Sequence, residues 1–366
     1  MATHDATWRY RDRFGDRYGR TYFRRFGPGV VSSIGAGSYR GDPTPAVDER
    51  HREALVTALE NGCNVLDTAP DYRAGRAQGV VGDALSAAEV DRDSVLLATK
   101  GGFLPFDGER PADPSAYVRS EFVDTGIVDP DALAHGSHAM TPAFLEAMLD
   151  RSLDALGVDA VDCYYVHSPE TQLAARSRDA VYDQLGAAFE SLEREIDRGR
   201  IGSYGVASWE AFRVPPEHDR HLSLARVLET ARSAAESVGR DADDHGLAAL
   251  QLPFNVHMAD AFTSAHHEAL ESGEAVSALE FAHREGLSVF ASSALMGGDL
   301  VAGLPPDISA ELAGDSPTQR AINFARSAPA VVSALVGMGR TAYVREDLAA
   351  GTFDPLGASA FDAVFE

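Results

Sequence analysis

The stretch Val95-Leu-Leu-Ala-Thr-Lys-Gly-Gly102 joins an apolar run to a lysine and two glycines. The run predicts a short buried strand that ends at the glycines. Lys100 is the only lysine in 366 residues, so 31 of the 32 basic residues are arginine. A lysine offers a compact charge whose pKa responds to its surroundings, which arginine does not. Lys100 is therefore a candidate catalytic residue, although a composition poor in lysine could also leave one by chance.

Strand-like and helix-like segments alternate on both sides of this stretch. The predicted strands are Val30–Ser38, Cys63–Asp67, Val95–Thr99, Ala160–Val166, Ile201–Val206, Leu247–Leu252, Leu287–Ala291 and Val331–Val336. Helical spacing predicts helices at Val47–Asn61, Ala77–Ala88, Thr141–Leu156, Val181–Arg198, Leu222–Val238, Ala275–Arg284, Thr318–Arg326 and Thr341–Ala350. Continuous apolar strands are typical of a parallel sheet covered on both faces. Eight such units predict an α/β fold, the closed (β/α)8 TIM barrel.

A doubly wound open sheet is the alternative architecture. It would carry a Gly-x-Gly-x-x-Gly turn after the first strand, but Gly35-Ala-Gly37 is followed by Ser-Tyr-Arg. We expect one barrel over residues 30–350, with an N-terminal extension (1–29) packed on it and a C-terminal tail (351–366). Residues 101–140 are expected to form a long loop inserted after the third strand, and their aromatic residues argue against disorder.

The composition limits the partners of the chain. Its formal net charge is −24, which disfavours binding to nucleic acid and to anionic membranes. Together with the scarcity of lysine, this charge resembles that of proteins from salt-loving microbes. Cys63 and Cys163 lie in apolar runs and are expected to be buried, reduced thiols. Met1–Tyr10 lacks an apolar signal core and no run of 18 apolar residues occurs, so we expect a cytoplasmic protein.

Several predicted strands end in a polar residue, and in a barrel such ends meet at one mouth, where active sites lie. Each residue alone has a structural explanation, such as capping a turn or bonding the backbone. Their shared position at strand ends points to a common site. These residues are Asp67, Lys100, His167, Ser208, Gln251 and the pair Ser292-Ser293.

Four segments carry a family resemblance. Asn64-Val-Leu-Asp-Thr-Ala-Pro-Asp-Tyr72 and Leu153–His167 resemble two signatures of the aldo-keto reductases. Arg198–Ser208 resembles the segment before the nicotinamide contacts, and Ser333–Leu348 resembles the end that holds the adenosine phosphate. The resemblance spans about residues 30–350 and implies the same barrel.

The resemblance implies a catalytic tetrad of Asp67, Tyr72, Lys100 and His167. Reducing a carbonyl requires a hydride at carbon and a proton at oxygen. Tyrosine, with an ordinary pKa of about 10, is a weak acid near neutrality, and an ammonium within about 4–6 Å would lower that pKa. Asp67 would hold the ammonium, and His167 would orient the carbonyl.

The resemblance also implies a nicotinamide cofactor, with NADP(H) favoured over NAD(H). Ser208 and Gln251 would bond the carboxamide, and Tyr343 stands where an arginine often grips the 2′-phosphate, a role that Arg340 or Arg345 could take. The expected cofactor-binding residues are Ser38, Tyr39, Asp67, Ser208, Gln251, Ser292, Ser293, Leu295, Gly337, Gly339, Arg340, Glu346 and Asp347. Two further departures from the family are Ala77-Gln78 in place of Ser-Glu, and Ser292 in place of an aromatic residue.

The expected function is hydride transfer between NAD(P)(H) and an aldehyde, ketone or sugar. One alternative is a barrel lyase that uses Lys100 as a Schiff-base nucleophile, although Asp67 would keep that lysine protonated. Another is a cofactor-sensing subunit with little turnover, since some family members are partners of membrane channels. No metal is expected, because the histidine pairs His135/His138 and His266-His267 lack companion ligands. Substrate specificity is expected in residues 101–140 and 351–366.

Overall fold

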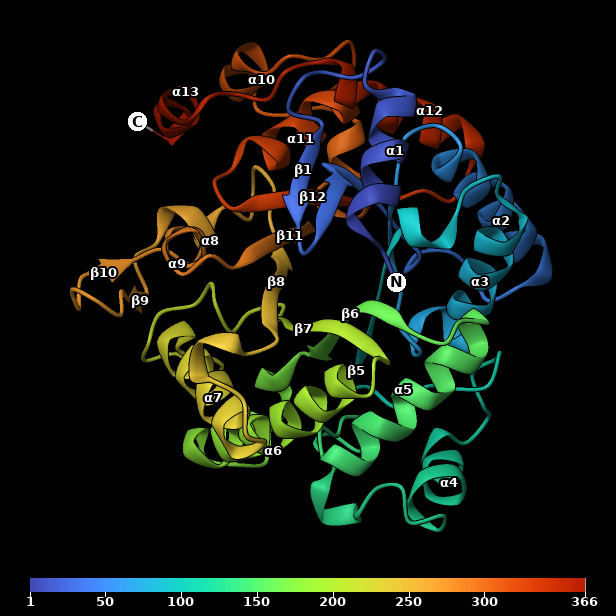
Figure 1. The fold of residues 1–366 in the computed structure, drawn as a ribbon, viewed down its shortest axis with the longest axis vertical. Coiled ribbons are helices and arrows are strands. Elements are labelled where there is room, and N and C mark those ends of the chain that lie inside the picture. Colours follow the sequence, from blue (N-terminus) through green and yellow to red (C-terminus); the bar gives the residue numbers. More distant parts are fainter. Residues whose placement is uncertain (366) are drawn as a thin grey trace.

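Eight parallel strands close into a barrel in the computed structural model of this chain, which describes residues 1–365 (Figure 1). Each strand pairs with the next along the chain, and β12 pairs with β3 to close the ring. The predicted TIM barrel is confirmed. The strands are β3 (Ile34–Gly37), β4 (Val65–Asp67), β5 (Leu96–Gly101), β6 (Val161–His167), β7 (Ile201–Ala207), β8 (Leu247–Pro253), β11 (Ser288–Ser292) and β12 (Val331–Gly337).

Helices that follow the strands form the outer layer (Figure 1). In α5, Pro142 stands in the first turn after Thr141, and Gly157 ends the helix at φ 64°, a left-handed conformation that glycine adopts at little cost. Phe144, Leu145, Met148 and Leu149 of that helix are buried. The main helices are α2 (Pro45–Leu59), α3 (Ala77–Ala87), α5 (Pro142–Leu156), α6 (Arg178–Asp197), α7 (Leu224–Ser237), α9 (Ala278–Arg284), α11 (Pro317–Ser327) and α12 (Thr341–Ala349).

The predicted strand Val30–Ser38 is wrong as a single element, because two strands occupy it. The chain begins with α1 (His4–Phe14), and then β1 (Phe23–Phe26) and β2 (Gly29–Ser32) form an antiparallel hairpin before β3. Phe26 of the hairpin packs against Phe290 of the barrel interior, with ring centroids 5.2 Å apart. The hairpin therefore buries Phe26 and Val31 among residues of the barrel interior.

The insert at residues 101–140 is ordered. It contains α4 (Pro114–Val118), a π-helical turn at Arg119–Val123 and a 3-10 turn at Pro130–Ala132. A chain of edge-on aromatic contacts runs through it from Phe106 to Tyr117, Phe122 and then Phe144 of α5. These contacts tie the insert to α5 through its aromatic residues, which the sequence analysis took as an argument against disorder.

The segment 260–277 and the C-terminal tail differ from expectation. The expected helix Ala275–Arg284 begins only at Ala278, because β10 (Ala275–Val276) pairs with β9 (His267–Glu268). In the tail, Phe361 is fully buried and packs against other phenylalanine rings. The remaining short helices are α8 (Asp260–Thr263), α10 (Pro306–Glu311) and α13 (Ala358–Asp362). In the part of the chain that the structure describes, no helix combines the length and apolarity needed to cross a bilayer.

Candidate active site

A cavity of about 1050 Å³ opens at the carboxyl ends of the barrel strands. Its size lies at the upper end of the range of roughly 300–1,000 Å³ that small-molecule sites span. The wall is built by the ends of the barrel strands and the segments that follow them, with Phe103 after β5 and Gln251 within β8, so residues distant in sequence face one space. The polar strand ends predicted from the sequence meet here, as parallel strands of a barrel require.

Lys100 and Asp67 form a buried ion pair at the base of this cavity. Lys100 Nζ donates to Asp67 Oδ1 at 2.6 Å and to the Thr68 carbonyl oxygen at 3.0 Å. The side chain of Lys100 is 1% exposed and does not reach the cavity wall, whereas Asp67 does. Asp67 Oδ2 accepts a hydrogen bond from Gln251 Nε2 at 2.8 Å, which fixes the carboxylate from the other side. The ammonium is therefore separated from the cavity by its neighbours.

Tyr72 lies above this pair, at the start of a 3-10 turn (Tyr72–Gly75) that follows β4. Lys100 Nζ is 5.0 Å from the centroid of the Tyr72 ring. Burial raises the pKa of Tyr72 well above its ordinary value, and the charges of Asp67 and Asp71 raise it further. The expected lowering of this pKa is therefore wrong for the protein alone, where desolvation and the nearby acidic groups all favour the neutral phenol.

His167 is the last residue of β6. Its ring meets that of Tyr72 edge-on, with the two centroids 6.1 Å apart. Its position is set by His138 of the insert, whose Nε2 donates to the His167 carbonyl oxygen at 2.7 Å, while Gln172 Nε2 donates to His138 Nδ1 at 2.9 Å. Burial lowers the pKa of His138 to about 4, so its ring is neutral and can serve both bonds. Burial also lowers the pKa of His167 well below its ordinary value, with Lys100 and His138 adding to the effect.

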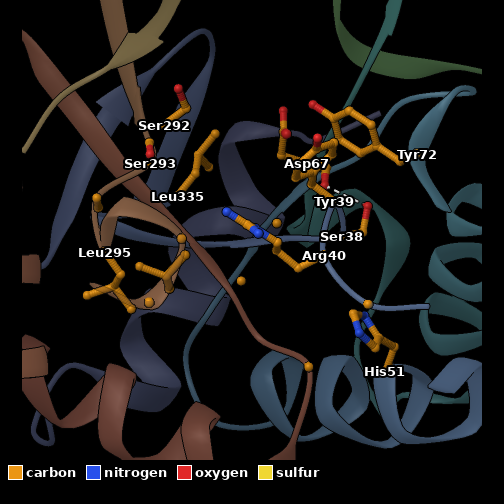
Figure 2. A pocket seen from close by; sticks show the side chains of 18 of the residues that line it. Ser38, Tyr39, Arg40, His51, Asp67, Tyr72, Ser292, Ser293, Leu295 and Leu335 are labelled. Atoms are coloured by element: carbon orange, nitrogen blue, oxygen red, sulfur yellow. Dashed lines mark hydrogen bonds between the residues drawn. The ribbon is translucent and has the colours of Figure 1, made fainter. Parts of the chain in front are cut away.

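All thirteen expected cofactor-binding residues line the one cavity. Figure 2 shows Tyr39, Asp67 and Tyr72 on one side and Ser292, Ser293 and Leu295 on the other. The full set is Ser38, Tyr39, Asp67, Ser208, Gln251, Ser292, Ser293, Leu295, Gly337, Gly339, Arg340, Glu346 and Asp347. The sequence thus located one continuous wall, and the role of each residue in it stays a prediction.

The hydroxyl of Ser208 is already hydrogen-bonded within the protein. Its hydroxyl donates to Glu170 Oε1 at 3.0 Å and accepts from the Ala211 backbone amide at 2.8 Å. The same Glu170 oxygen also accepts from the Trp209 amide at 2.8 Å. Ser208 therefore retains one lone pair and no donor, so it can accept one bond from a ligand but offers it no proton.

The sequence analysis missed several residues of the wall. Arg40 reaches from the loop after β3 toward the loop that carries Ser293 and Leu295 (Figure 2), and a Cβ on Gly297 would lie 2.1 Å from its Nη2. The others are Arg50, His51, Asp71, Phe103 and Trp209. Asp71 stands inside a quoted motif and could have been singled out by its place before Tyr72. Phe103 lies in the insert where specificity was expected, and no sequence signal marks Arg40, Arg50, His51 or Trp209.

The expected specificity segments contribute little to this wall. Phe103 is the one residue of 101–140 in it, and the described part of 351–366 supplies none. The tail packs its rings elsewhere, so its assignment to specificity is wrong. Among residues 1–365 no group of three or more His, Cys, Asp or Glu residues could hold a metal ion.

The sequence of this chain is similar to those of known proteins. The profile of the "Aldo/keto reductase family" matches residues 33–216. A 6-dehydroglucose reductase from Novosphingobium aromaticivorans is 26% identical over 198 residues, which are 51% of this chain and 51% of the relative. A D-threo-aldose 1-dehydrogenase from Pseudomonas is 28% identical over 161 residues, 44% of each chain. The chain thus spans about half the length of the curated relatives it matches.

Solved structures share the fold along nearly the whole chain. The glycerol dehydrogenase from Gluconobacter oxydans superposes with a TM-score of 0.64 at 17% identity and covers 95% of both chains. An aldo-keto reductase from Klebsiella pneumoniae in complex with NADPH has a TM-score of 0.59 at 18% identity, with 94% of both chains covered. Since the family profile covers half of the sequence and includes Asp67, Tyr72, Lys100 and His167, the chain belongs to the aldo/keto reductase family.

Proposed function

We propose that this protein is an NAD(P)(H)-dependent oxidoreductase that interconverts a carbonyl compound and its alcohol. The observation that carries the proposal is the convergence of Asp67, Tyr72, Lys100 and His167 from three strand ends and one adjoining turn at a single cavity. A bound nicotinamide would supply or accept the hydride there. The protein supplies the proton and the orientation of the substrate.

The wall of the cavity fits a nicotinamide dinucleotide. Asp347 Oδ2 is buried without a hydrogen-bond partner, and burial with the nearby Glu346 raises the pKa of Asp347 to about 8, so it can offer a proton to an adenine ring. His51 Nδ1 is likewise buried without a partner. These two orphaned groups are the kind of polar atoms that a bound ligand satisfies.

Tyr72 serves as the proton donor in the reduction direction. Its raised pKa keeps it a phenol at neutral pH. The alkoxide that develops on the substrate oxygen is a stronger base than a phenolate, so transfer from the phenol runs downhill. As the proton leaves, the Lys100 ammonium behind the ring stabilises the negative charge on Tyr72. His167, held by His138, orients the carbonyl oxygen.

Three arginines support a preference for NADP(H). Arg40, Arg50 and Arg340 line the cavity, and none has a carboxylate within salt-bridge distance in the part of the chain described. Arg340 also precedes α12, whose N-terminus favours anions. A ligand with a 2′-phosphate in addition to its diphosphate uses this positive charge best.

Titration of intrinsic fluorescence with NADPH and NADH tests the cofactor, because Trp209 lines the cavity and is 52% exposed. We expect saturable quenching, tighter for NADPH, and a Trp209→Phe variant should lose most of the signal. A panel of neutral aldehydes, ketones and sugars, followed at the nicotinamide absorbance, then tests turnover. The proposal fails if a folded sample binds neither nucleotide. Binding without reduction of any carbonyl would favour a cofactor-sensing subunit.

The geometry argues against a Schiff-base lyase. Lys100 Nζ is held by Asp67 and Thr68 and does not line the cavity, so no substrate carbonyl can reach it without disrupting the ion pair. Borohydride with a carbonyl substrate should therefore trap no adduct on Lys100.

We propose further that the enzyme works in the cytoplasm of a salt-adapted organism. The support is the net charge of −24 with one lysine, and two buried cysteines that are both free.

A further inference from the structure

Asp71 places a second carboxyl group in the active site, directly before Tyr72 in the chain. It lines the cavity and its side chain is 23% exposed. Its Oδ1 is fully buried and has no hydrogen-bond partner among the described residues. Leaving such a group unpaired costs on the order of 1–3 kcal/mol or more. The group therefore has unused capacity to accept hydrogen bonds.

The backbone holds this carboxyl group in a fixed direction. The residues after Tyr72 form a left-handed turn, with φ 53° at Arg73 and 55° at Ala74. The buried Arg73 guanidinium ties the turn down by donating to the Asp42 carbonyl oxygen at 3.1 Å and to the Asp48 carboxylate. Positive φ at residues other than glycine persists where the surrounding structure enforces it. Asp71 is thus part of a built wall.

No cation neutralises Asp71. Its nearest titratable partner is His167, whose Nδ1 lies 3.8 Å from Asp71 Oδ1, and the low pKa of His167 makes that ring neutral at physiological pH. Lys100, the one ammonium nearby, is bonded to Asp67. The phenol of Tyr72, whose pKa the charge of Asp71 raises, is a further ionisable neighbour, and it carries no positive charge. At neutral pH the carboxylate therefore presents a negative charge to whatever occupies the substrate end of the cavity.

Aromatic rings surround this charge. Tyr39 meets Tyr72 edge-on at 5.0 Å, and Phe103 meets His167 edge-on at 5.0 Å. Tyr39 is 62% exposed at the rim. Apolar ring faces beside an acceptor carboxylate suit a molecule that has C–H faces and hydroxyl edges, and repel one that carries an anion.

We propose that Asp71 selects the substrate by accepting a hydrogen bond from a hydroxyl group next to the reacting carbonyl. The site then takes neutral hydroxy-carbonyl compounds such as small sugars, and discriminates against carbonyl compounds that carry a carboxylate or phosphate. This inference rests on the proposed oxidoreductase function, and it adds a specificity residue to it.

Three aldehydes of similar size test the proposal: glyceraldehyde, which has hydroxyls, propanal, which has none, and succinic semialdehyde, which is anionic. Asp71→Leu should lower the ratio of kcat/KM for glyceraldehyde to that for propanal by about tenfold or more, because only glyceraldehyde loses a hydroxyl contact, whereas an effect through Tyr72 is common to both aldehydes. Asp71→Asn keeps the shape and an acceptor but removes the charge, so it should raise kcat/KM for succinic semialdehyde by about tenfold or more. Asp107→Asn, an exposed aspartate outside the cavity, controls for the change in net charge.

The dependence of kcat/KM on pH distinguishes recognition of the substrate by Asp71 from a purely structural role of this residue. Burial raises the pKa of Asp71 to about 6. As the pH falls through that value, the wild type should lose its discrimination against the anion, and Asp71→Asn should show no such change. Equal losses for glyceraldehyde and propanal, or unchanged discrimination in both variants, would overturn the inference. If the wild type binds NADPH but reduces none of the three aldehydes or the wider panel, the oxidoreductase function itself fails.

Discussion

The Asp67 carboxylate is held between Lys100 and Gln251, with one oxygen 2.6 Å from the lysine Nζ and the other 2.8 Å from the glutamine Nε2. The first bond joins β4 to its neighbour β5. The second joins β4 to β8, which is not its neighbour in the barrel. Breaking a buried ion pair from one side costs about 3–5 kcal/mol, because it leaves an uncompensated charge. This pair therefore fixes the base of the site and the charge beneath Tyr72.

Lys100→Arg should fold and bind the nicotinamide cofactor but lose most turnover. The substitution keeps the charge, yet the planar guanidinium is larger than the ammonium that now contacts Asp67 and lies 5.0 Å from the Tyr72 ring centroid. Displacement of the reacting groups by about 1 Å can cost on the order of 100-fold in rate. The measurement is carbonyl-dependent NAD(P)H oxidation, with cofactor affinity and melting temperature as controls for folding. Activity within about tenfold of wild type, roughly 1.4 kcal/mol of barrier, would contradict the tetrad assignment.

Gln251→Glu should destabilise the protein more at pH 8 than at pH 5. The new carboxyl group would face Asp67 Oδ2, where the amide now donates a hydrogen bond. Two like charges in contact raise the pKa of one of them, so the variant regains stability as the pH falls and that group takes up a proton. Urea unfolding at both pH values measures this. Gln251→Met, which removes the donor without adding charge, is the matched control and should show no such pH dependence relative to wild type.

The barrel and the cavity wall could be predicted because both depend on patterns local to the chain. An apolar run that ends in a polar residue specifies a buried strand and its exit, and closure of the barrel then brings Asp67, Lys100 and His167 together. The break between β2 and β3 was missed because Ser33, where it falls, lies between apolar residues on both sides. Distant segments bond Ser33: its amide donates to the Tyr22 carbonyl oxygen at 2.7 Å, and its Oγ accepts from Arg326 Nε at 2.9 Å.

Interactions between segments that are distant in the sequence could likewise not be predicted. The insert contributes His138, which bonds the carbonyl oxygen of His167, and a Cβ on Gly102 would lie 2.4 Å from that same oxygen. Glycine after the lysine strand is therefore required by a neighbour 65 residues away, which the sequence could not reveal. The raised pKa of Tyr72 was missed for the same reason, since it depends on burial.

His138→Gln should weaken the dependence of stability on pH. His138 has a pKa of about 4 in the folded protein and of about 6.5 when unfolded. The unfolded chain therefore binds the proton first, and the histidine contribution is complete above pH 6.5 and is lost as the pH falls toward 4. Between pH 7 and pH 5 the free energy of unfolding of the wild type should fall by about 2 kcal/mol more than that of the variant. Unfolding by urea at the two pH values, variant against wild type, measures the difference; parallel losses would show that His138 is not neutral in the fold.

The melting temperature should rise steeply between dilute buffer and about 1 M KCl. The chain carries 56 acidic and 32 basic residues, so its surface charges repel one another when they are weakly screened. At about 1 M salt the Debye length falls to about 3 Å, which removes repulsion between carboxylates while costing little from exposed ion pairs. An uncharged osmolyte at equal osmolality is the control, because it favours the compact state without screening charge. A larger rise in KCl than in the osmolyte isolates the electrostatic contribution. A melt that is the same at both salt concentrations would remove the case for a salt-adapted protein.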